Sequence, residues 1–383
     1  MIIKSRQIKI IMRMQRYKKI KVIISGGGTG GHVFPAISIA NALHQKIQEA
    51  EILFVGAKKK LEMKKVPEAG FKIIGLNIAG FQRGFYWKNL LLPFKIIDSL
   101  IKAKKIINEF NPDVVVGVGG YASGPILKIA TAKKIPTVIQ EQNSYPGITN
   151  RMLAAKVDKI CVAHNGMDKY FPKDKIYLTG NPVRKDVVDL DGKRNAALTY
   201  FKLKPDRQTV LIVGGSLGAK SINEAIYGNL EMLVNNNIQL IWQTGRLFFA
   251  KASSLTLKYE QVKVYDFINH MDMAYAAADV VVSRAGAIAI SEISAVKKPA
   301  IFVPSPNVAE DHQTKNALSL VNYKAALLVN DNNANNELGE TIVNLVNDKH
   351  LQEKLIKNIS GLGFLNAADR IAELIINTSK NNQ

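Results

Sequence analysis

Glycines follow an apolar run near the start of this chain, and glycines in that position can bind a phosphate group. Residues 22–24 are apolar, and five of the six residues at 26–31 are glycine. Because glycine lacks a Cβ and tolerates positive φ, its backbone N–H groups can converge on an anion, and a following helix adds its dipole. The sequence therefore predicts a phosphate cradle here, with a helix starting near Phe34 and Pro35.

The same glycines also allow a dinucleotide-binding interpretation. Gly26, Gly28 and Gly31 match G-x-G-x-x-G. Such a domain has an acidic residue about 20 residues further on, after the second strand, where it holds the ribose hydroxyls. Here the apolar run 52–55 leads into Ala57 and the lysines 58–60. NADP binding stays open as a minority interpretation, and the recurrence of glycine loops further along the chain argues against it.

Composition sets broad limits on the protein. A chain of 383 residues with 47% hydrophobic residues is expected to form two globular domains. The only cysteine, Cys161, lies in an apolar run, so we expect a small buried residue and a reducing compartment. The net charge of +21 suggests nucleic acid, an anionic membrane or a phosphorylated substrate.

The N-terminus is strongly basic. Residues 1–19 contain seven Lys or Arg and no acid, which leaves +14 of the net charge on the rest of the chain. We interpret this segment as a dispensable extension, because it lacks the uninterrupted apolar core of a secretory signal. No stretch approaches the roughly 18 apolar residues of a membrane span, so the chain is not expected to cross a bilayer.

Short β-branched runs alternate with helical patterns, which is typical of parallel α/β sheets. The first half predicts strands at 22–24, 52–55, 72–76, 114–118, 137–139 and 160–162, and helices at 35–48, 89–110, 124–134 and 147–155. After a polar linker at 189–195, the second half predicts strands at 210–213, 240–242, 262–265, 280–283, 300–303 and 326–329. A last helix at 366–377 is expected to return to the first domain.

Each half has a glycine turn after an early strand, at 26–31 and at 214–219. Such sheets bind ligands outside the carboxyl ends of their strands. The expected fold class is therefore α/β, with two Rossmann-like domains facing across a cleft, the GT-B architecture of glycosyltransferases.

Six motifs now make a resemblance specific. They lie at residues 25–32, 117–125, 141–143, 180–184, 214–216 and 283–292. In order and spacing they resemble the MurG family of peptidoglycan glycosyltransferases, from about residue 21 to the C-terminus. The resemblance implies an inverting enzyme without a cofactor that transfers N-acetylglucosamine from UDP-N-acetylglucosamine to the C4 hydroxyl of the N-acetylmuramyl group of lipid I, giving lipid II.

The resemblance also implies a domain organisation. Residues 1–19 form the extension, residues 20–182 plus 362–383 form an acceptor and membrane-docking domain, and residues 183–361 bind the UDP-sugar. In the second domain Glu292 resembles the family glutamate whose two acceptor oxygens take the ribose hydroxyls. The N–H groups of residues 286–288, with Ser216, would hold the diphosphate.

Further donor contacts are implied by the same resemblance. Phe267 would pack beside the base, the Ile268 backbone would read the uracil edge, and Arg184 would lie near the nucleotide. His312 and Gln313 would reach the sugar hydroxyls. The expected donor-binding residues are Thr29, Gly30, Gly31, His32, Asn143, Arg184, Ser216, Phe267, Ile268, Arg284, Ala287, Ile288, Glu292, His312 and Gln313. Taken singly, several of these residue types also occur as helix caps, core residues or solvated helix positions.

The first domain would hold the lipid-linked acceptor. The resemblance assigns the acceptor diphosphate to Gly28, Gly30, Gly31, Gly119 and Gly120. His32 is our candidate for the base or a positioning group, since an unperturbed histidine suits a base near neutrality. A histidine that only contacts phosphate or caps the helix is the alternative. Glu141 and Tyr121 complete the candidate catalytic set.

Metal catalysis has no support in the sequence. Asp189 and Asp191 form a D-x-D pattern, but they lie in the polar linker and not at a strand end. We expect no metal. Three positions depart from the family pattern: Leu217 replaces a glutamine, Gln140 a histidine and Ala289 a threonine. We expect the loss of two side-chain hydrogen bonds near the phosphate to weaken donor affinity, and Gln140 rules out a catalytic histidine at its site.

Residues 81–95 mix aromatic, aliphatic and basic residues, as an interfacial membrane segment does. A buried helix with exposed lysines is the alternative.

The implied partners are UDP-N-acetylglucosamine, lipid I, an anionic membrane surface and other cell-wall and division proteins, at the cytoplasmic face of the bacterial inner membrane. The rival functions are a nucleic-acid-binding protein, for which we find no recognition motif, and a UDP-N-acetylglucosamine 2-epimerase or a glycolipid transferase.

Overall fold

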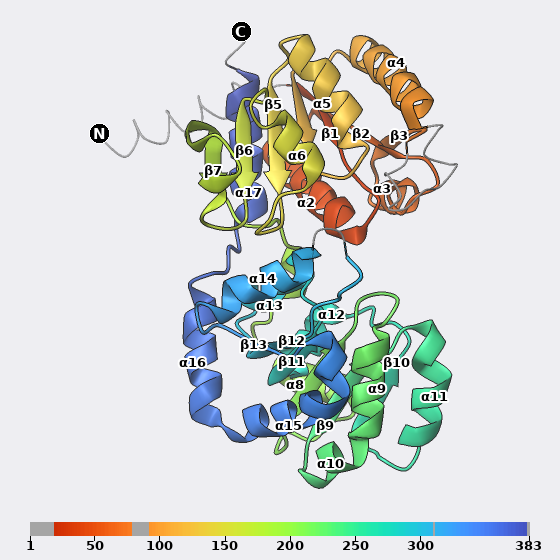
Figure 1. Ribbon diagram of the computed structural model, residues 1–383, viewed down its shortest axis with the longest axis vertical. Helices are drawn as coiled ribbons and strands as arrows, with labels where there is room; N and C mark the ends of the chain where they lie inside the picture. The colour runs from red at the N-terminus through yellow and green to blue at the C-terminus, as the bar shows by residue number, and fades with distance from the viewer. Residues whose placement is uncertain (1–18, 79–91, 309–310, 381–383) are drawn as a thin grey trace, which may run out of the picture. The chain divides into compact units, whose positions relative to one another are not determined.

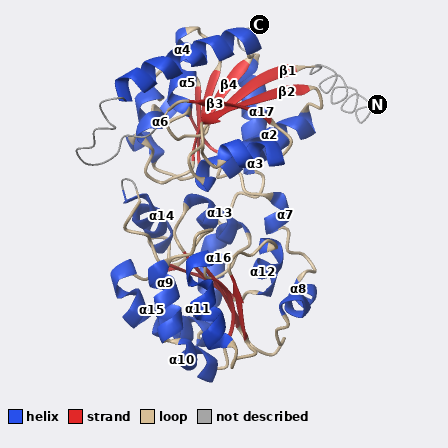
Figure 2. Cartoon of the chain, turned by 90° about the vertical axis from the view of Figure 1, so that its right-hand side faces the viewer, coloured by secondary structure: helices blue, strands red, loops and turns tan. Residues whose placement is uncertain are grey.

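The computed structural model describes residues 19–78, 92–308 and 311–380. The chain divides into two compact units, Met1–Pro182 with Asn366–Gln383, and Val183–Leu365 (Figure 1). Each unit is built on one parallel sheet covered by helices (Figure 2). The expectation of two parallel α/β sheets is therefore confirmed.

The sheet of the first unit has, among the described residues, seven strands in the order β3-β2-β1-β4-β5-β6-β7. Their bounds are Ile20–Ser25 (β1), Ala50–Ala57 (β2), Lys72–Leu76 (β3), Val114–Gly117 (β4), Thr137–Glu141 (β5), Lys159–Val162 (β6) and Ile176–Leu178 (β7). The chain runs outward from β1 to β3 and then returns to place β4 on the other side of β1. The topological switch point, where such sheets bind ligands, thus lies between β1 and β4.

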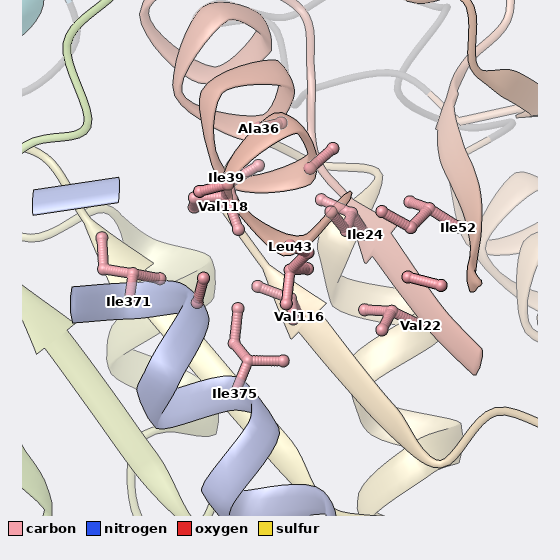
Figure 3. Packing of buried hydrophobic residues seen from close by; sticks show 14 of the residues in the cluster. Val22, Ile24, Ala36, Ile39, Leu43, Ile52, Val116, Val118, Ile371 and Ile375 are labelled. Atoms are coloured by element: carbon pink, nitrogen blue, oxygen red, sulfur yellow. The ribbon is translucent and has the colours of Figure 1, made fainter. Parts of the chain in front are cut away.

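Successive side chains of β1 point to opposite faces of this sheet and contribute to the hydrophobic core on both faces. Val22 and Ile24 belong to one buried cluster and Ile23 to another. On the first face, α17 (Ala367–Ser379) packs against α2 (Gly30–Lys46), and Figure 3 shows Ile371 and Ile375 of α17 beside residues of α2 and the sheet. The last helix of the chain is therefore part of the first unit.

The remaining helices of the first unit connect consecutive strands. They are α3 (Glu62–Glu68), α4 (Leu92–Phe110), α5 (Ser123–Ala132) and α6 (Ile148–Leu153). Helices α4 and α5 pack against each other. Their buried side chains, such as Ile107 and Ile126, cover the face of the sheet opposite α2 and α17.

The second unit repeats this plan. Among the described residues its six strands are ordered β10-β9-β8-β11-β12-β13, all parallel. The bounds are Thr209–Val213 (β8), Gln239–Gln243 (β9), Val262–Tyr265 (β10), Val280–Ser283 (β11), Ala300–Phe302 (β12) and Leu327–Leu328 (β13). The switch point lies between β8 and β11.

Besides a 3₁₀ helix at Asp331–Asn333, ten α-helices of the second unit fall within the described residues. They are α7 (Lys185–Val188), α8 (Arg194–Phe201), α9 (Lys220–Gly228), α10 (Leu230–Asn235), α11 (Arg246–Thr256), α12 (Met271–Ala277), α13 (Ala287–Ala295), α14 (His312–Val321), α15 (Ala334–Asn347) and α16 (Lys349–Ser360). Two buried clusters fill the two faces of the sheet, one with Leu211 and Ile241, the other with Val210 and Trp242.

Three elements differ from the sequence-based expectation: the start of α2, helix α3 (Glu62–Glu68), which was not expected, and strand β7. Helix α2 begins at Gly30, five residues before Pro35. Thr29 precedes it in an extended conformation, and the missing N–H of Pro35 removes only one hydrogen bond near the start of a 17-residue helix. The short strand β7 was not expected, because its three half-buried residues show too little alternation to be read as a strand.

Several sequence-based interpretations concern residues outside the described ranges. The extension lies there except for Lys19, as do residues 81–91 of the expected interfacial segment. None of the helices in the described part of the chain has the length and apolar character needed to span a bilayer. Cys161 is fully buried as expected, and this burial raises the pKa of its thiol to about 12.

His164, just beyond β6, makes stability depend on pH. Burial lowers the pKa of His164 from 6.5 to about 4, and a hydrogen bond with the backbone of Gln142 opposes this shift only in part. The folded state therefore binds this proton less readily than the unfolded chain, so stability is lost as pH falls from 6.5 towards 4. In His164→Gln this loss should shrink by up to about 3 kcal/mol, as measured by urea unfolding across that range. Identical pH profiles of variant and parent would contradict the assignment.

Candidate functional site

The two glycine loops of the first unit meet at its switch point. In the register of β1 and β4, Ser25 is opposite Gly117, so the loops leave the sheet side by side. A Cβ on Gly120 would lie 2.3 Å from the carbonyl oxygen of Gly27, and one on Gly26 would lie 2.3 Å from Val118 Cγ2. Only glycine allows the two backbones to approach this closely.

His32 lies in the first turn of α2, where these loops meet. Its Nδ1 is 3.1 Å from the Thr29 hydroxyl. A Cβ on Gly119 would lie 2.8 Å from His32 Cδ2 and 3.0 Å from Nε2. The imidazole therefore lies against the second glycine loop. Tyr121 follows that loop and is 55% exposed. The structure thus brings Thr29, His32 and Gly119 together.

Glu62, which the sequence analysis did not single out, supports the first glycine loop. This residue starts α3 and is 1% exposed. Its Oε2 accepts a hydrogen bond from Gly28 N at 2.9 Å, and its Oε1 accepts one from Ala57 N at 2.8 Å. An acidic residue thus does follow the second strand, five residues after the last residue of β2, Ala57. It contacts the loop backbone.

Glu141, a candidate catalytic residue, is buried within its own loop. Oε1 accepts hydrogen bonds from the backbone and side-chain nitrogens of Asn143, at 3.0 and 3.1 Å. Oε2 accepts from Gly147 N at 3.1 Å and from Asn150 Nδ2 at 2.8 Å. With 1% exposure and four donors, this carboxylate holds residues 142–150 in shape.

Buried amides link this loop to its neighbours. Gln142 donates to the carbonyl of Val118 at 2.8 Å and also contacts Gln140. Gln140 donates to Asn181 Oδ1 at 2.9 Å, and Asn181 donates to the carbonyl of Gln142 at 3.0 Å. Gln140, where the family usually has a histidine, is thus a member of a closed hydrogen-bonded network behind the second glycine loop.

The switch point of the second unit has the same construction. Val213 of β8 is opposite Ser283 of β11, so the loops at 214–219 and 284–286 leave the sheet together. Gly286 is the N-cap of α13, so the first N–H groups of that helix, including those of Ala287 and Ile288, stand at its start, where an anion would be stabilised. Ser216 is exposed in the neighbouring loop.

Gln243, at the end of β9, connects the glycine loop at 214–219 with the segment of Phe267 and Ile268, and the sequence alone did not indicate it. Its Nε2 donates to the carbonyl of Gly215 at 2.9 Å, and its Oε1 accepts from Ile268 N at 2.8 Å. The Ile268 N–H is therefore bonded within the protein, and its side chain is buried. Phe267 beside it is 48% exposed, as contact with a base would require.

Glu292 lies in the second turn of α13 and is 9% exposed. Its Oε2 accepts a hydrogen bond from the Tyr275 hydroxyl at 3.2 Å, and its Oε1 is 3.9 Å from Arg184 Nη2. Burial, and then the Glu292 charge, raise the pKa of Tyr275 well above its ordinary value, so Tyr275 stays a donor. The carboxylate that the sequence assigned to a diol is thus oriented by a buried tyrosine and paired with a cation.

Arg284 is held by protein groups instead of facing open solvent. Its guanidinium contacts the Asp331 carboxylate, donates to the carbonyl of Val303 at 3.0 Å and to the Ser221 hydroxyl at 3.0 Å. These contacts tie the loop after β11 to α9 and to the segment before α15. Asp331 and Ser221 carry no local sequence pattern that would have identified them.

The other residues predicted to bind the UDP-sugar lie in loops or at the starts of helices. His312 begins α14, and the Oε1 of Gln313 accepts a hydrogen bond from Ser305 N at 2.9 Å. Leu217, where the family usually has a glutamine, is 85% exposed. In the described ranges, no group of three or more His, Cys, Asp or Glu is arranged to hold a metal ion.

Two Rossmann-like sheets, each with paired loops at its switch point, are the GT-B fold of glycosyltransferases. The family comparisons make the assignment specific. The glycosyltransferase family 28 N-terminal domain matches residues 22–162, and the family 28 C-terminal domain matches residues 209–373. The chain belongs to this family, and within it to the MurG enzymes, as the following relatives show.

The relatives match over nearly their full length. The UDP-N-acetylglucosamine–N-acetylmuramyl-(pentapeptide) pyrophosphoryl-undecaprenol N-acetylglucosamine transferase of Flavobacterium psychrophilum is 52% identical over 95% of this chain and 98% of its own. The protein of the same name from Parabacteroides distasonis is 51% identical over 94% and 98%. The crystal structure of Acinetobacter baumannii MurG is 26% identical, with a TM-score of 0.76 over 94% of this chain and 99% of that one.

Proposed function

We propose that this enzyme transfers N-acetylglucosamine from UDP-N-acetylglucosamine to the C4 hydroxyl of the N-acetylmuramyl group of lipid I, giving lipid II. The observation that carries this proposal is the sequence identity of 52% and 51% with transferases of that name, over 95% and 94% of this chain. The two switch-point sites support it, since the reaction needs one site for a nucleotide diphosphate and another for a lipid-linked diphosphate.

The second unit is proposed to bind the donor. The Glu292 carboxylate would accept hydrogen bonds from both ribose hydroxyls, and Arg184 would leave it to approach the diphosphate. The start of α13 and Ser216 would stabilise the negative charge that develops on UDP as the bond to the sugar breaks. Phe267 would pack beside uracil, and the Ile268 carbonyl is left to read its edge, since the N–H is bonded to Gln243. His312 and Gln313 would contact the sugar.

The first unit is proposed to bind the acceptor and to supply the base. If His32 Nδ1–H donates to Thr29, Nε2 carries the lone pair that can take the proton from the C4 hydroxyl. The hydroxyl oxygen then forms a bond with the anomeric carbon from the face opposite UDP, which inverts the configuration. Gly30 and Gly31, at the start of α2, and the loop of Gly119 and Gly120 would bind the acceptor diphosphate, with Tyr121 beside it.

Glu141 and Arg284 are proposed to act by holding loops. Glu141 already accepts four hydrogen bonds, which leaves little capacity for a reacting hydroxyl. Arg284 donates to three different segments of its own unit. Asn143, which donates to Glu141 through its backbone and side chain, would be positioned by it for contact with a substrate.

We also propose that the enzyme docks on the cytoplasmic face of the inner membrane, where it would meet lipid I and other cell-wall and division proteins. Helix α4 supports this. Phe94, Ile97 and Ile101 are 71%, 56% and 67% exposed and lie on one face at helical spacing, with Lys104 and Lys105 further along. An exposed apolar stripe next to basic residues fits an anionic bilayer surface.

Replacing Phe94 and Ile101 by serine should reduce binding to vesicles of phosphatidylglycerol and cardiolipin roughly tenfold, because two side chains that would enter the interface are lost. Co-sedimentation measures this, with donor binding as a test of folding. Leu247→Ser with Leu257→Ser is the matched control, since these leucines are 98% and 87% exposed in the other unit. Equal losses in both double variants would refute a docking face on α4.

The proposed reaction is tested by UDP release from UDP-N-acetylglucosamine with and without lipid I, together with the mass of the lipid product. We expect release that depends on the acceptor, and one N-acetylhexosamine added to the lipid. Donor binding without transfer would show that the acceptor is another molecule. No donor binding would refute the function altogether.

A further inference from the structure

We propose that Glu62 is a positioning residue that shapes the acceptor site from behind the first glycine loop. This inference rests on the proposed function, because it takes that loop as part of the acceptor diphosphate site. The residue is remote in sequence from the loop, and its carboxylate touches neither of the reacting groups assigned above.

The structure provides a closely fitted place for this carboxylate. Glu62 is 1% exposed, and its two oxygens accept from Gly28 N and Ala57 N at 2.9 and 2.8 Å. A Cβ on Gly27 would lie 2.2 Å from Glu62 Oε1, and one on Gly56 would lie 2.5 Å from its Cγ. Two glycines therefore leave the volume that the side chain occupies, one in the loop and one in β2.

This arrangement changes how the loop can bind an anion. The family resemblance assigns Gly28 to the acceptor diphosphate, but the Gly28 N–H donates its hydrogen bond to Glu62. A carboxylate behind the loop also repels a second anion that would enter on the same side. The diphosphate is thereby directed to the N–H groups of Gly30 and Gly31 at the start of α2, next to His32.

Glu62→Gln tests this assignment with little change in volume. The amide can accept only one of the two N–H groups, and its own NH2 group faces the other. We expect the KM for lipid I to rise roughly tenfold, as for the loss of one charge-assisted hydrogen bond, while the KM for UDP-N-acetylglucosamine and the affinity for UDP stay within twofold. Glu68→Gln is the matched control, because Glu68 lies on the same helix in an exposed ion pair with Lys65.

Gly56→Ala provides a second route, since it displaces the Glu62 side chain without removing its charge. Like Glu62→Gln, it should raise the KM for lipid I. An unchanged KM for lipid I in a Glu62→Gln protein that transfers sugar would overturn the positioning role. Equal increases in both KM values, or a loss of donor binding, would show a general structural role instead. If the parent enzyme transfers nothing to lipid I, the proposed function fails, and the acceptor-site role of Glu62 that rests on it fails too.

Discussion

Glu292→Ala is expected to weaken the binding of UDP-N-acetylglucosamine at least about 100-fold. Two hydrogen bonds from the ribose hydroxyls to a charged, largely buried carboxylate would be lost, and each such bond contributes about 1.5–3 kcal/mol. Glu292→Gln keeps one acceptor oxygen, and its affinity for UDP-N-acetylglucosamine should fall roughly tenfold. Tyr275→Phe removes only the hydroxyl that orients Glu292, so its affinity for UDP-N-acetylglucosamine should fall by a few-fold. Isothermal titration calorimetry measures all three affinities.

A ligand without the ribose hydroxyls separates the proposed contact from a general loss of folding. The parent and Glu292→Ala should bind 2′,3′-dideoxy-UDP with similar affinity, because the group that the carboxylate recognises is absent. UDP and 2′,3′-dideoxy-UDP differ only in the ribose hydroxyls, so their affinities for the parent and for Glu292→Ala form a double-mutant cycle across protein and ligand. Equal affinity of parent and Glu292→Ala for UDP-N-acetylglucosamine would refute the ribose assignment.

His32→Asn should lower kcat by roughly 100-fold to 10,000-fold, the range for loss of a general base. Donor affinity should change little, since the histidine acts on the acceptor hydroxyl. Asparagine keeps a polar group near Thr29 but cannot take a proton at neutral pH. Steady-state rates at saturating donor and acceptor measure the effect on kcat.

His44→Asn is the control for this variant. His44 lies on the same helix and contacts the carbonyl of Ala50 at its far end. It should keep kcat within a few-fold of the parent, even if the protein unfolds at a lower temperature. A His32→Asn enzyme with the same kcat as the His44→Asn enzyme would show that another group takes the proton.

The local pattern of residue types was sufficient to predict most strands and helices of the fold. Every expected strand is present, because short β-branched runs between helical segments can be recognised without knowledge of their partners. The errors occur where local pattern is weak. Strand β7 has only three residues, and the start of α2 at Gly30 was hidden because glycine and an internal proline both argue against a helix.

The same contrast holds within the sites. The glycine loops could be predicted because positive φ and close backbone contact require glycine itself, as at Gly119 and Gly120. The partners of the predicted side chains could not be predicted. Gln243 and Tyr275 have ordinary surroundings in the sequence, and neither belongs to a motif.

The sequence by itself determined the class of sheet, the positions of the glycine loops and, through the order of six motifs, the family. These properties depend on residue type and spacing along the chain. Only the tertiary structure decided that Gly28 N–H is bonded to Glu62, that Tyr275 orients Glu292 and that Asp331 holds Arg284. The physical reason is that a buried polar group must find a partner, and which partner it finds depends on the order of the strands and the packing of the helices.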